Sequence, residues 1–214
     1  MSRSTRKWGP VTAIAPASAV SEAYRSLRTN LEFSIRGKGL KTIMVASAMP
    51  GEGKSTTAAN LAVAYARANR RVLLVDANLR SPVQHRMFGL ANVNGLSGLL
   101  GGAGEFDQAI QPAAVDNLWV LCSGPIPPHP SELLDSAAMT ALLRTAGERF
   151  DIVLVDTPPL LSVTDALVVA GKCDGVLLVV GAGKLKPDAA WKAKTSLANS
   201  KATVIGAVLN GAGR

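Results

Sequence analysis

The sequence predicts an α/β fold, a single domain in which helices cover both faces of an open, mostly parallel sheet. The chain has 214 residues, which is enough for one sizeable domain. Its composition is 48% hydrophobic with only 4% aromatic residues, so the core must consist mainly of Val, Leu, Ile and Ala. Apolar runs of strand length alternate with segments at helical spacing, which is typical of parallel strands joined by right-handed helical crossovers.

The expected elements follow in order along the chain. Apolar residues at helical spacing predict a helix over about residues 20–36, which glycines end. The continuous apolar run of residues 40–48 predicts a buried strand, and a helix follows over about residues 54–69. The remaining expected elements are strand 71–76, short helices between 82 and 111, strand 118–124, helix 131–148, strand 150–156, helix 163–171, strand 174–183, helix 187–199 and strand 202–210. Ligands bind beyond the carboxyl ends of parallel strands, so chemistry is expected where strands end in Asp or run into Gly.

The net charge of +8 is concentrated at the two ends of the chain. Residues 1–40 hold seven Lys/Arg against two Glu, and residues 181–214 hold six against one Asp, so each end carries +5 and the body −2. We divide the chain into a basic N-terminal arm, residues 1–17, and one domain, residues 18–214. Basic ends indicate contact with an inner membrane surface, an acidic partner or nucleic acid, although solvated ends that aid solubility explain the charge equally well.

The sequence lacks the features of a membrane or secreted protein. No apolar run approaches the ~20 residues of a membrane span, and the first ten residues do not resemble a signal peptide. Cys122 and Cys173 have no metal-ligand spacing and are expected to be structural thiols in a reducing compartment. We therefore expect a cytoplasmic protein.

Residues 48–56, AMPGEGKST, lie between an expected strand and an expected helix, as a phosphate-binding loop requires. Glycines let backbone amides converge on an anion, and the helix that begins near Lys54 adds its positive end. Lys54 can reach the β and γ phosphates, and the Ser55 hydroxyl can ligate Mg²⁺. The strict pattern asks for Gly where Ala48 stands. The loop predicts a P-loop NTPase whose nucleotide-binding residues are Pro50, Gly51, Glu52, Gly53, Lys54, Ser55 and Thr56.

Two other expected strands end in Asp. Asp156 follows the apolar residues 152–155 and can hold Mg²⁺ directly or through water. Asp76 ends the strand 71–76 and is expected at the same crevice, where Arg80 can pair with phosphate or with a neighbouring carboxylate. With two acids, one can serve the metal while the other handles the attacking hydroxyl or water, which indicates more than passive nucleotide binding.

Five motifs in order resemble those of the BY-kinases of the CpsD/CapB type, the bacterial tyrosine kinases of capsule and exopolysaccharide systems. They are SEAYRSLRTN with Glu22, Arg25 and Arg28, SAMPGEGKST, VLLVDANLRSP, GPIPPHPSELL and VLVDTPP. The resemblance runs from Ser18 to Asn210. The nearest competitors are the MinD/ParA-type ATPases, which share the fold but carry a signature Lys where this chain has Met49.

The resemblance implies an enzyme that binds ATP and Mg²⁺ and transfers the γ-phosphoryl group to tyrosine. It implies that Lys54 stabilises the transferring phosphate, that Ser55 and Asp156 hold Mg²⁺, and that Asp76 acts at the acceptor hydroxyl as base or metal contact. It also implies that Asn210 contacts adenine and that Glu22, Arg25 and Arg28 on the helix 18–36 mediate self-association. Because these three residues stand at i, i+3 and i+6, they can equally form an ion-pair stripe along the helix.

The implied partners are a membrane-embedded polysaccharide co-polymerase that activates the kinase, protein tyrosine substrates and further copies of the chain. No nucleic acid is expected. The implied location is the cytoplasm, at the inner face of the cell membrane through that partner.

The chain departs from the family pattern at two places. Asn78 stands where the motif D-x-D has its second Asp, and an Asn can neither carry charge nor remove a proton. This either slows phosphoryl transfer or, if Asp76 does the work, matters little. The family's C-terminal tyrosine cluster is missing, and the two tyrosines, Tyr24 and Tyr65, occupy core-like helix positions. The alternatives are a tail that was cut off, substrates on other proteins, or a nucleotide switch that does not phosphorylate tyrosine.

Overall fold

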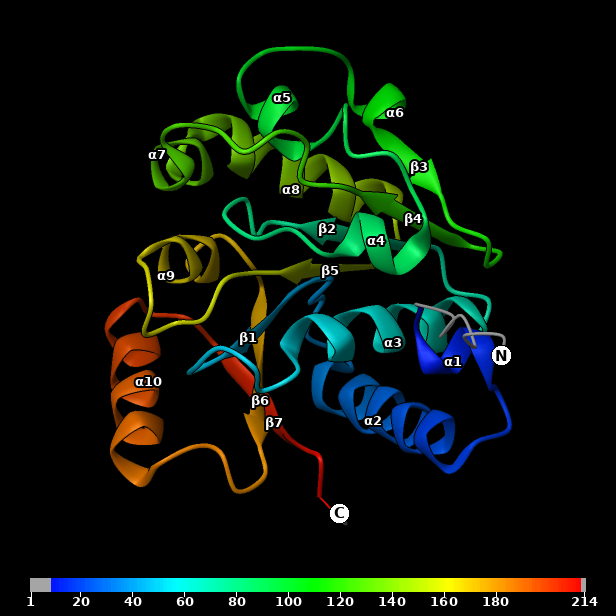
Figure 1. The fold of residues 1–214 in the computed structure, drawn as a ribbon, viewed down its shortest axis with the longest axis vertical. Helices are drawn as coiled ribbons and strands as arrows, with labels where there is room; N and C mark the ends of the chain where they lie inside the picture. Colours follow the sequence, from blue (N-terminus) through cyan, green and yellow to red (C-terminus); the bar gives the residue numbers. More distant parts are fainter. Residues whose placement is uncertain (1–8, 213–214) are drawn as a thin grey trace, which may run out of the picture.

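The computed structural model describes residues 9–212, which form a seven-stranded sheet with helices on both faces (Figure 1). The elements are α1 Val11–Ile14, α2 Ala19–Ile35, β1 Thr42–Ser47, α3 Lys54–Ala66, β2 Val72–Asp76, α4 Gln84–Phe88, α5 Leu96–Leu100, α6 Phe106–Ala109, β3 Ile110–Pro112, β4 Leu118–Leu121, α7 Pro130–Asp135, α8 Ala137–Arg149, β5 Ile152–Asp156, α9 Asp165–Ala170, β6 Gly175–Gly181, α10 Pro187–Asn199 and β7 Val204–Asn210.

The strand order is β3-β4-β2-β5-β1-β6-β7. All neighbouring strands are parallel except the edge strand β3, which runs antiparallel to β4. The central strands β1, β2 and β5 are buried along their whole length, because helices cover both of their faces. The predicted α/β fold with a mostly parallel sheet is confirmed.

The core has two layers, one on each face of the sheet. Side chains alternate between the faces, so Ile43 and Val45 of β1 pack under α2 and α3, while Met44 and Ala46 pack on the other face. That other face is covered by α5 and α7–α10. Half of the buried residues of α3 are Ala, whose small side chains let this helix lie close to the sheet.

Helix boundaries follow from local capping. Ser18 begins α2 because its side chain accepts a hydrogen bond from the backbone N–H of Ser21 at 3.2 Å. The single helix predicted over 131–148 is wrong: the chain forms two helices, α7 and α8, separated at Ser136. Ser136 has an extended backbone with ψ 157°, and its hydroxyl accepts the Met139 N–H at 3.3 Å and donates to the Leu133 carbonyl at 2.7 Å. A serine that caps its own backbone in this way interrupts a helix.

Two short elements were not predicted. The first is α1, where Thr12 is buried and bonds to the Asn60 side chain of α3 through its backbone N–H at 2.9 Å and its hydroxyl at 3.0 Å. Helix α1 lies within the expected N-terminal arm, and residues 1–8 of that arm lie outside the described residues. The second is β3, whose three residues include Pro112, and proline is tolerated at a sheet edge. Within residues 9–212, no helix is both long enough and apolar enough to cross a membrane.

Candidate active site

Three central strands end at the same edge of the sheet and bring the expected site residues together. Strand β1 runs into the glycine-rich loop, and β2 and β5 end in Asp76 and Asp156, which are paired in register. Both acids are fully buried. The structure therefore places Lys54, Ser55, Asp76 and Asp156 around one point at the carboxyl ends of the strands.

The glycine-rich loop has the conformation that its sequence requires. Gly51 and Gly53 have φ values of 79° and 96°, a region that favours glycine. Gly53 has a second constraint, because a Cβ atom there would lie 2.0 Å from the Asn210 side-chain nitrogen. Helix α3 begins directly after Gly53, so its N-terminal amides point toward the loop. This arrangement can bind an anion.

The Glu52 side chain fixes the conformation of the phosphate loop. Its carboxylate accepts the Met49 N–H at 2.6 Å and the Gly181 N–H at 3.1 Å, and the residue is only 2% exposed. The side chain therefore joins the loop to the end of β6. Both bonds come from backbone N–H groups of the protein, and the predicted contact of Glu52 with nucleotide stays a prediction.

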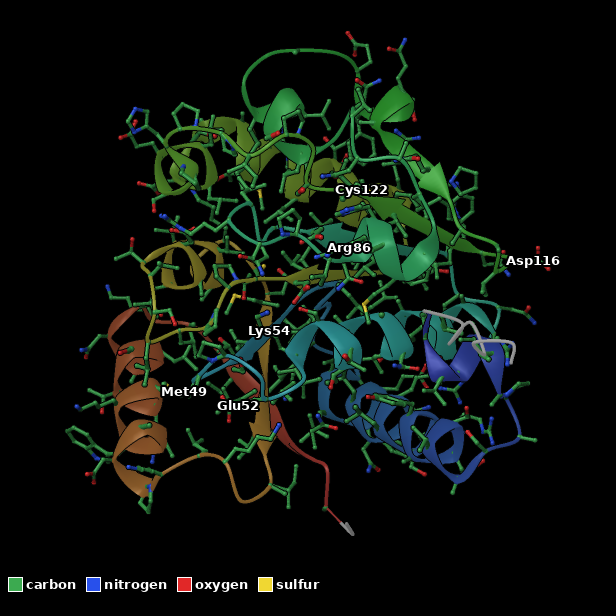
Figure 2. The ribbon with its side chains drawn as sticks, viewed as in Figure 1. Met49, Glu52, Lys54, Arg86, Asp116 and Cys122 are labelled. Carbon is green, nitrogen blue, oxygen red and sulfur yellow. The ribbon has the colours of Figure 1, made fainter. Side chains whose placement is uncertain are left out.

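The loop opens on a cavity of about 370 Å³. It is lined by loop and α3 residues on one side and by residues of the β2–α4 region on the other, namely Gly51, Gly53, Lys54, Ser55, Thr56, Val83, Arg86 and Met87. Pro50 lies exposed beside the opening. Figure 2 shows Lys54 at the start of α3 and Arg86 on α4. Two cations of opposite walls thus face one cavity next to a helix N-terminus, which suits a polyphosphate.

Asp156 has one free oxygen. Its Oδ2 accepts the Gln84 side-chain amide at 2.8 Å, whereas its buried Oδ1 has no hydrogen-bond partner and lies 3.9 Å from the Lys54 ammonium. Burial raises the pKa of Asp156, and the charge of Lys54 partly offsets this effect. An unpaired buried carboxylate oxygen is costly unless a further group binds it.

Both carboxylate oxygens of Asp76 are hydrogen-bonded to backbone groups. They accept the N–H groups of Asn78 at 3.2 Å, Val83 at 3.0 Å and Gln84 at 2.9 Å. Burial, and after it the neighbouring charge of Asp156, raises the pKa of Asp76 from 3.8 to about 7. A raised pKa is the direction that a general base working near neutral pH requires.

The residues present fit a magnesium ion. Mg²⁺ prefers oxygen ligands and in such sites is bound by one or two carboxylates together with the phosphates of a substrate. The free Oδ1 of Asp156 faces Lys54, which itself donates to the Ser55 hydroxyl at 3.0 Å. Asp156 and Ser55 would hold the ion, and the unpaired Oδ1 of Asp156 supports this fit.

Arg80 and Asn78 are engaged within the protein. The Arg80 guanidinium binds Asp165 through two bonds of 2.9 and 3.0 Å, and Ser131 also bonds to Asp165. Of the two predicted partners for Arg80, the structure thus shows the carboxylate. Asn78 closes a turn: its amide donates to the Ser81 carbonyl at 3.0 Å and its Oδ1 accepts the Ser81 N–H at 3.3 Å.

Asn210 lies beside the phosphate loop, at the end of β7. Its amide donates to the Glu52 carbonyl at 2.9 Å. It lines a hollow of about 480 Å³ with Lys184 and the segment 181–183, which follows β6. Lys184 in turn donates to the Gly51 carbonyl at 3.0 Å. This hollow adjoins the phosphate loop.

The three residues expected to mediate self-association lie along α2. Arg25 forms an ion pair with Glu22 on the same helix and donates to the Pro16 carbonyl at 2.9 Å. Arg28 instead reaches α3 and donates to the Ala64 carbonyl at 3.3 Å. The structure therefore shows the helical ion pair for two members of the trio and an internal contact for the third.

Sequence reasoning missed Gln84 and Arg86 at the site. Gln84 is fully buried and bonds to both Asp156 and the Ser55 carbonyl, and Arg86 lines the phosphate cavity. The sequence did offer one signal for these residues. Both follow Asp76, the acidic end of a strand, by one short loop, and Arg86 is basic. Periodicity carries no information over so short an element.

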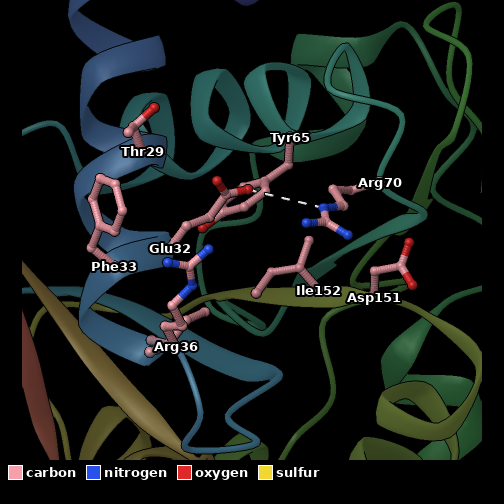
Figure 3. Close-up of a pocket in the computed structure, with 9 residues that line it drawn as sticks. Thr29, Glu32, Phe33, Arg36, Tyr65, Arg70, Asp151 and Ile152 are labelled. Atoms are coloured by element: carbon pink, nitrogen blue, oxygen red, sulfur yellow. Dashed lines mark ion pairs between the residues drawn. The ribbon is translucent and has the colours of Figure 1, made fainter.

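The predicted core position is confirmed for Tyr65 and only in part for Tyr24. Tyr65 is 2% exposed, and its ring reaches into a second hollow between the end of α2 and the start of β5, at the opposite end of α3 from Lys54 (Figure 3). Burial raises the pKa of Tyr65, and the Glu32 carboxylate adds to this effect. Tyr24 is half-buried, and burial raises its pKa, with a hydrogen bond to Thr57 acting in the opposite direction.

Comparison with known proteins distinguishes kinases from partitioning ATPases. The chain is 47% identical over 196 residues to tyrosine-protein kinase YwqD of Bacillus subtilis (strain 168), a match that covers 92% of this chain and 83% of YwqD. The chain belongs to the family of bacterial tyrosine-protein kinases. This kinase is also similar to the kinase domain of Escherichia coli tyrosine kinase ETK, with a TM-score of 0.92, 36% identity and coverage of 98% and 82% of the two chains. It matches 27% of the full Etk sequence of Escherichia coli (strain K12).

The kinase also belongs to a wider family of P-loop NTPases. Residues 39–213 of the kinase match the ParA family model, described as NUBPL iron-transfer P-loop NTPase. The cell division ATPase MinD of Pyrococcus furiosus shares the fold, with a TM-score of 0.71, 27% identity and coverage of 81% of the kinase and 73% of that chain. The predicted MinD-like P-loop NTPase fold and the predicted resemblance to BY-kinases are both confirmed.

Proposed function

We propose that this kinase transfers the γ-phosphoryl group of magnesium-bound ATP to tyrosine side chains of other proteins, in the control of capsule or exopolysaccharide synthesis. The observation that carries the proposal is the free Oδ1 of Asp156, which faces Lys54 and Ser55 at the mouth of the phosphate loop. The high identity to tyrosine-protein kinases supports the same reading.

Each site residue has a role in this proposal. We assign Pro50 to Thr56 to the phosphates, and Arg80, whose guanidinium is bound to Asp165, to supporting the segment after β2. We assign Asn210 to the adenine. Lys54 neutralises charge on the transferring phosphoryl group, and Ser55 and Asp156 hold the magnesium ion. Asp76, whose pKa is raised by burial and by the Asp156 charge, accepts the proton of the acceptor hydroxyl or contacts the metal. Magnesium, when bound, supplies charge neutralisation of the phosphates.

Removal of the Lys54 ammonium tests the enzymatic proposal. Lys54→Met should abolish phosphotyrosine formation on a tyrosine-bearing protein substrate supplied with labelled ATP, Mg²⁺ and an activator tail. We expect at least about a hundredfold loss, because a positioned charge at the transferring group contributes a few kcal/mol to transition-state stabilisation. Lys192→Met, an exposed lysine on α10, is the matched control. Equal labelling by Lys54→Met and the wild type would contradict the proposal.

The acceptor tyrosines lie on other proteins in this proposal, because Tyr65 is buried and Tyr24 is half-buried on a helix. We further propose a membrane-embedded polysaccharide co-polymerase as activator, which would bring the kinase to the inner face of the cell membrane. The small share of Etk that the kinase matches supports such a partner, since in Etk the kinase domain is one part of a much longer chain. Self-association through the part of α2 that carries Glu22, Arg25 and Arg28 belongs to the same proposal, with Arg28 holding this helix on α3.

A second candidate function is a nucleotide-switched regulator that does not phosphorylate tyrosine. Two observations favour it: Asn78 stands where the family motif has an acid, and Tyr65 is buried while Tyr24 is half-buried. ATP-dependent assembly without phosphotyrosine on any substrate would establish it. A positioning ATPase of the MinD/ParA type is not favoured, because uncharged Met49 stands at the position of the signature Lys.

A further inference from the structure

Gln84, the first residue of α4, contacts all three segments that carry the expected metal and proton-transfer groups. Its backbone N–H donates to Asp76 Oδ2 at 2.9 Å. Its side-chain amide donates to the Ser55 carbonyl at 3.1 Å and to Asp156 Oδ2 at 2.8 Å. A primary amide has two N–H donors, so both are used on residues that would hold the metal. The side chain is fully buried, which makes these bonds dry and well defined.

The bond to Oδ2 determines which oxygen of Asp156 stays free. Oδ1 has no hydrogen-bond partner and lies 3.9 Å from the Lys54 ammonium, on the side of the Ser55 hydroxyl. The terminal torsion of an Asp side chain has a broad energy profile, so packing alone holds it weakly. Gln84 supplies the missing restraint, because its donor must stay on Oδ2 or lose a buried hydrogen bond.

We propose that Gln84 is a positioning residue of the magnesium site, which holds the Asp156 carboxylate with Oδ1 open toward Lys54 and Ser55. This inference rests on the proposed function, since it concerns the cation that accompanies the nucleotide. Groups that orient a metal ligand typically change metal affinity about 10–100-fold when removed. Gln84 is absent from the residues that line the phosphate cavity, so its effect should fall on the cation and spare the nucleotide.

Magnesium-dependent binding of ADP to the full chain tests this inference without any phosphoryl transfer. Gln84→Met removes both donors at nearly constant volume. ADP affinity is measured by calorimetry in EDTA and over a series of Mg²⁺ concentrations. The Mg²⁺ concentration for half of the maximal effect should rise at least about tenfold, while ADP affinity in EDTA stays unchanged. Gln111→Met is the matched control, because that amide donates to the Ala91 carbonyl at 2.8 Å and to Cys122 Sγ at 3.7 Å and to none of the proposed metal-site residues.

The outcomes separate the inference from the proposed function. An unchanged Mg²⁺ dependence in a folded Gln84→Met protein overturns the role of Gln84, and so does an equal loss of ADP affinity with and without Mg²⁺. If Gln84→Met does not fold, Gln84→Asn keeps the amide one methylene short of Asp156 and should give the same shift. A wild-type chain that binds no ADP at any Mg²⁺ concentration would instead contradict the nucleotide site itself.

Discussion

At the residue scale, Asn78 lies inside the tight turn that follows β2, only 6% exposed. Its two side-chain bonds to Ser81 need one donor and one acceptor, and only the amide supplies both. Its backbone N–H meanwhile donates to Asp76. The departure from D-x-D is therefore accommodated structurally: the residue shapes the turn that positions Asp76.

This geometry predicts the effect of restoring the acid. Asn78→Asp should bring no gain in phosphoryl transfer and should lower the free energy of unfolding by about 1–3 kcal/mol. The aspartate loses the donor to Ser81 and adds a buried negative charge near Asp76 and Asp156. Initial rates of phosphotyrosine formation and chemical denaturation measure the two quantities.

Asn92→Asp is the control for that comparison. Asn92 bridges backbone in the same way, with its amide on the Gly124 carbonyl and its oxygen on the Gly124 N–H, both at 2.9 Å, but away from the two acids. Asn92→Asp should lower the free energy of unfolding without changing the rate of phosphoryl transfer. A several-fold faster Asn78→Asp enzyme would show that the natural site lacks a needed acid.

At the element scale, β1 matters most because it leads into the phosphate loop. Its start is held by Asp174, whose Oδ2 accepts the N–H groups of Lys41 and Thr42, both at 2.8 Å. Burial alone would raise the pKa of Asp174, but these backbone bonds outweigh it and hold the pKa below its usual value of 3.8. The carboxylate thus fixes where the strand begins.

The lowered pKa gives a pH-dependent stability prediction. Asp174→Ala should lower the free energy of unfolding by about 1 kcal/mol at pH 7, the low end for charged hydrogen bonds because the site is partly solvated. Since the folded-state pKa lies below the unfolded value, this contribution is present above about pH 3.9 and lost as pH falls through the folded-state pKa.

Urea denaturation at a series of pH values measures this dependence. The difference between Asp174→Ala and wild type should shrink toward zero in acid. Asp116→Ala, an exposed loop residue, should stay within about 0.5 kcal/mol of wild type throughout. A difference that persists at low pH would mean that the side chain acts by packing and not by charge.

At the scale of the whole molecule, α2 packs on α3 through one arginine and carries another in an exposed ion pair, at the surface proposed for self-association. Arg25 is an exposed member of the ion pair with Glu22, while Arg28 is tied to α3. Arg25→Ala should therefore weaken self-association while leaving stability within about 0.5 kcal/mol of wild type, because exposed ion pairs contribute little to folding. Sedimentation with and without ATP measures the assembly.

Two further variants make that test specific. Arg28→Ala should mainly lower thermal stability, since it removes a bond to the Ala64 carbonyl. Arg36→Ala, at the far end of the same helix and also exposed, should change neither property. If Arg25→Ala assembles as the wild type does, Glu22, Arg25 and Arg28 act only within one copy of the chain and do not mediate self-association.

The sequence by itself determined the alternation of strands and helices, the phosphate loop and the strand-end acids, because these depend on local periodicity and on residues adjacent in the chain. It also indicated the kinase family, which the comparisons confirmed. Only the tertiary structure decided which side chains meet: Gln84 on Asp156, Arg80 on Asp165, and Glu52 on the backbone of β6. Such contacts join residues 72, 85 and 129 positions apart, and no local pattern encodes them. They arise because parallel strands place their carboxyl ends side by side.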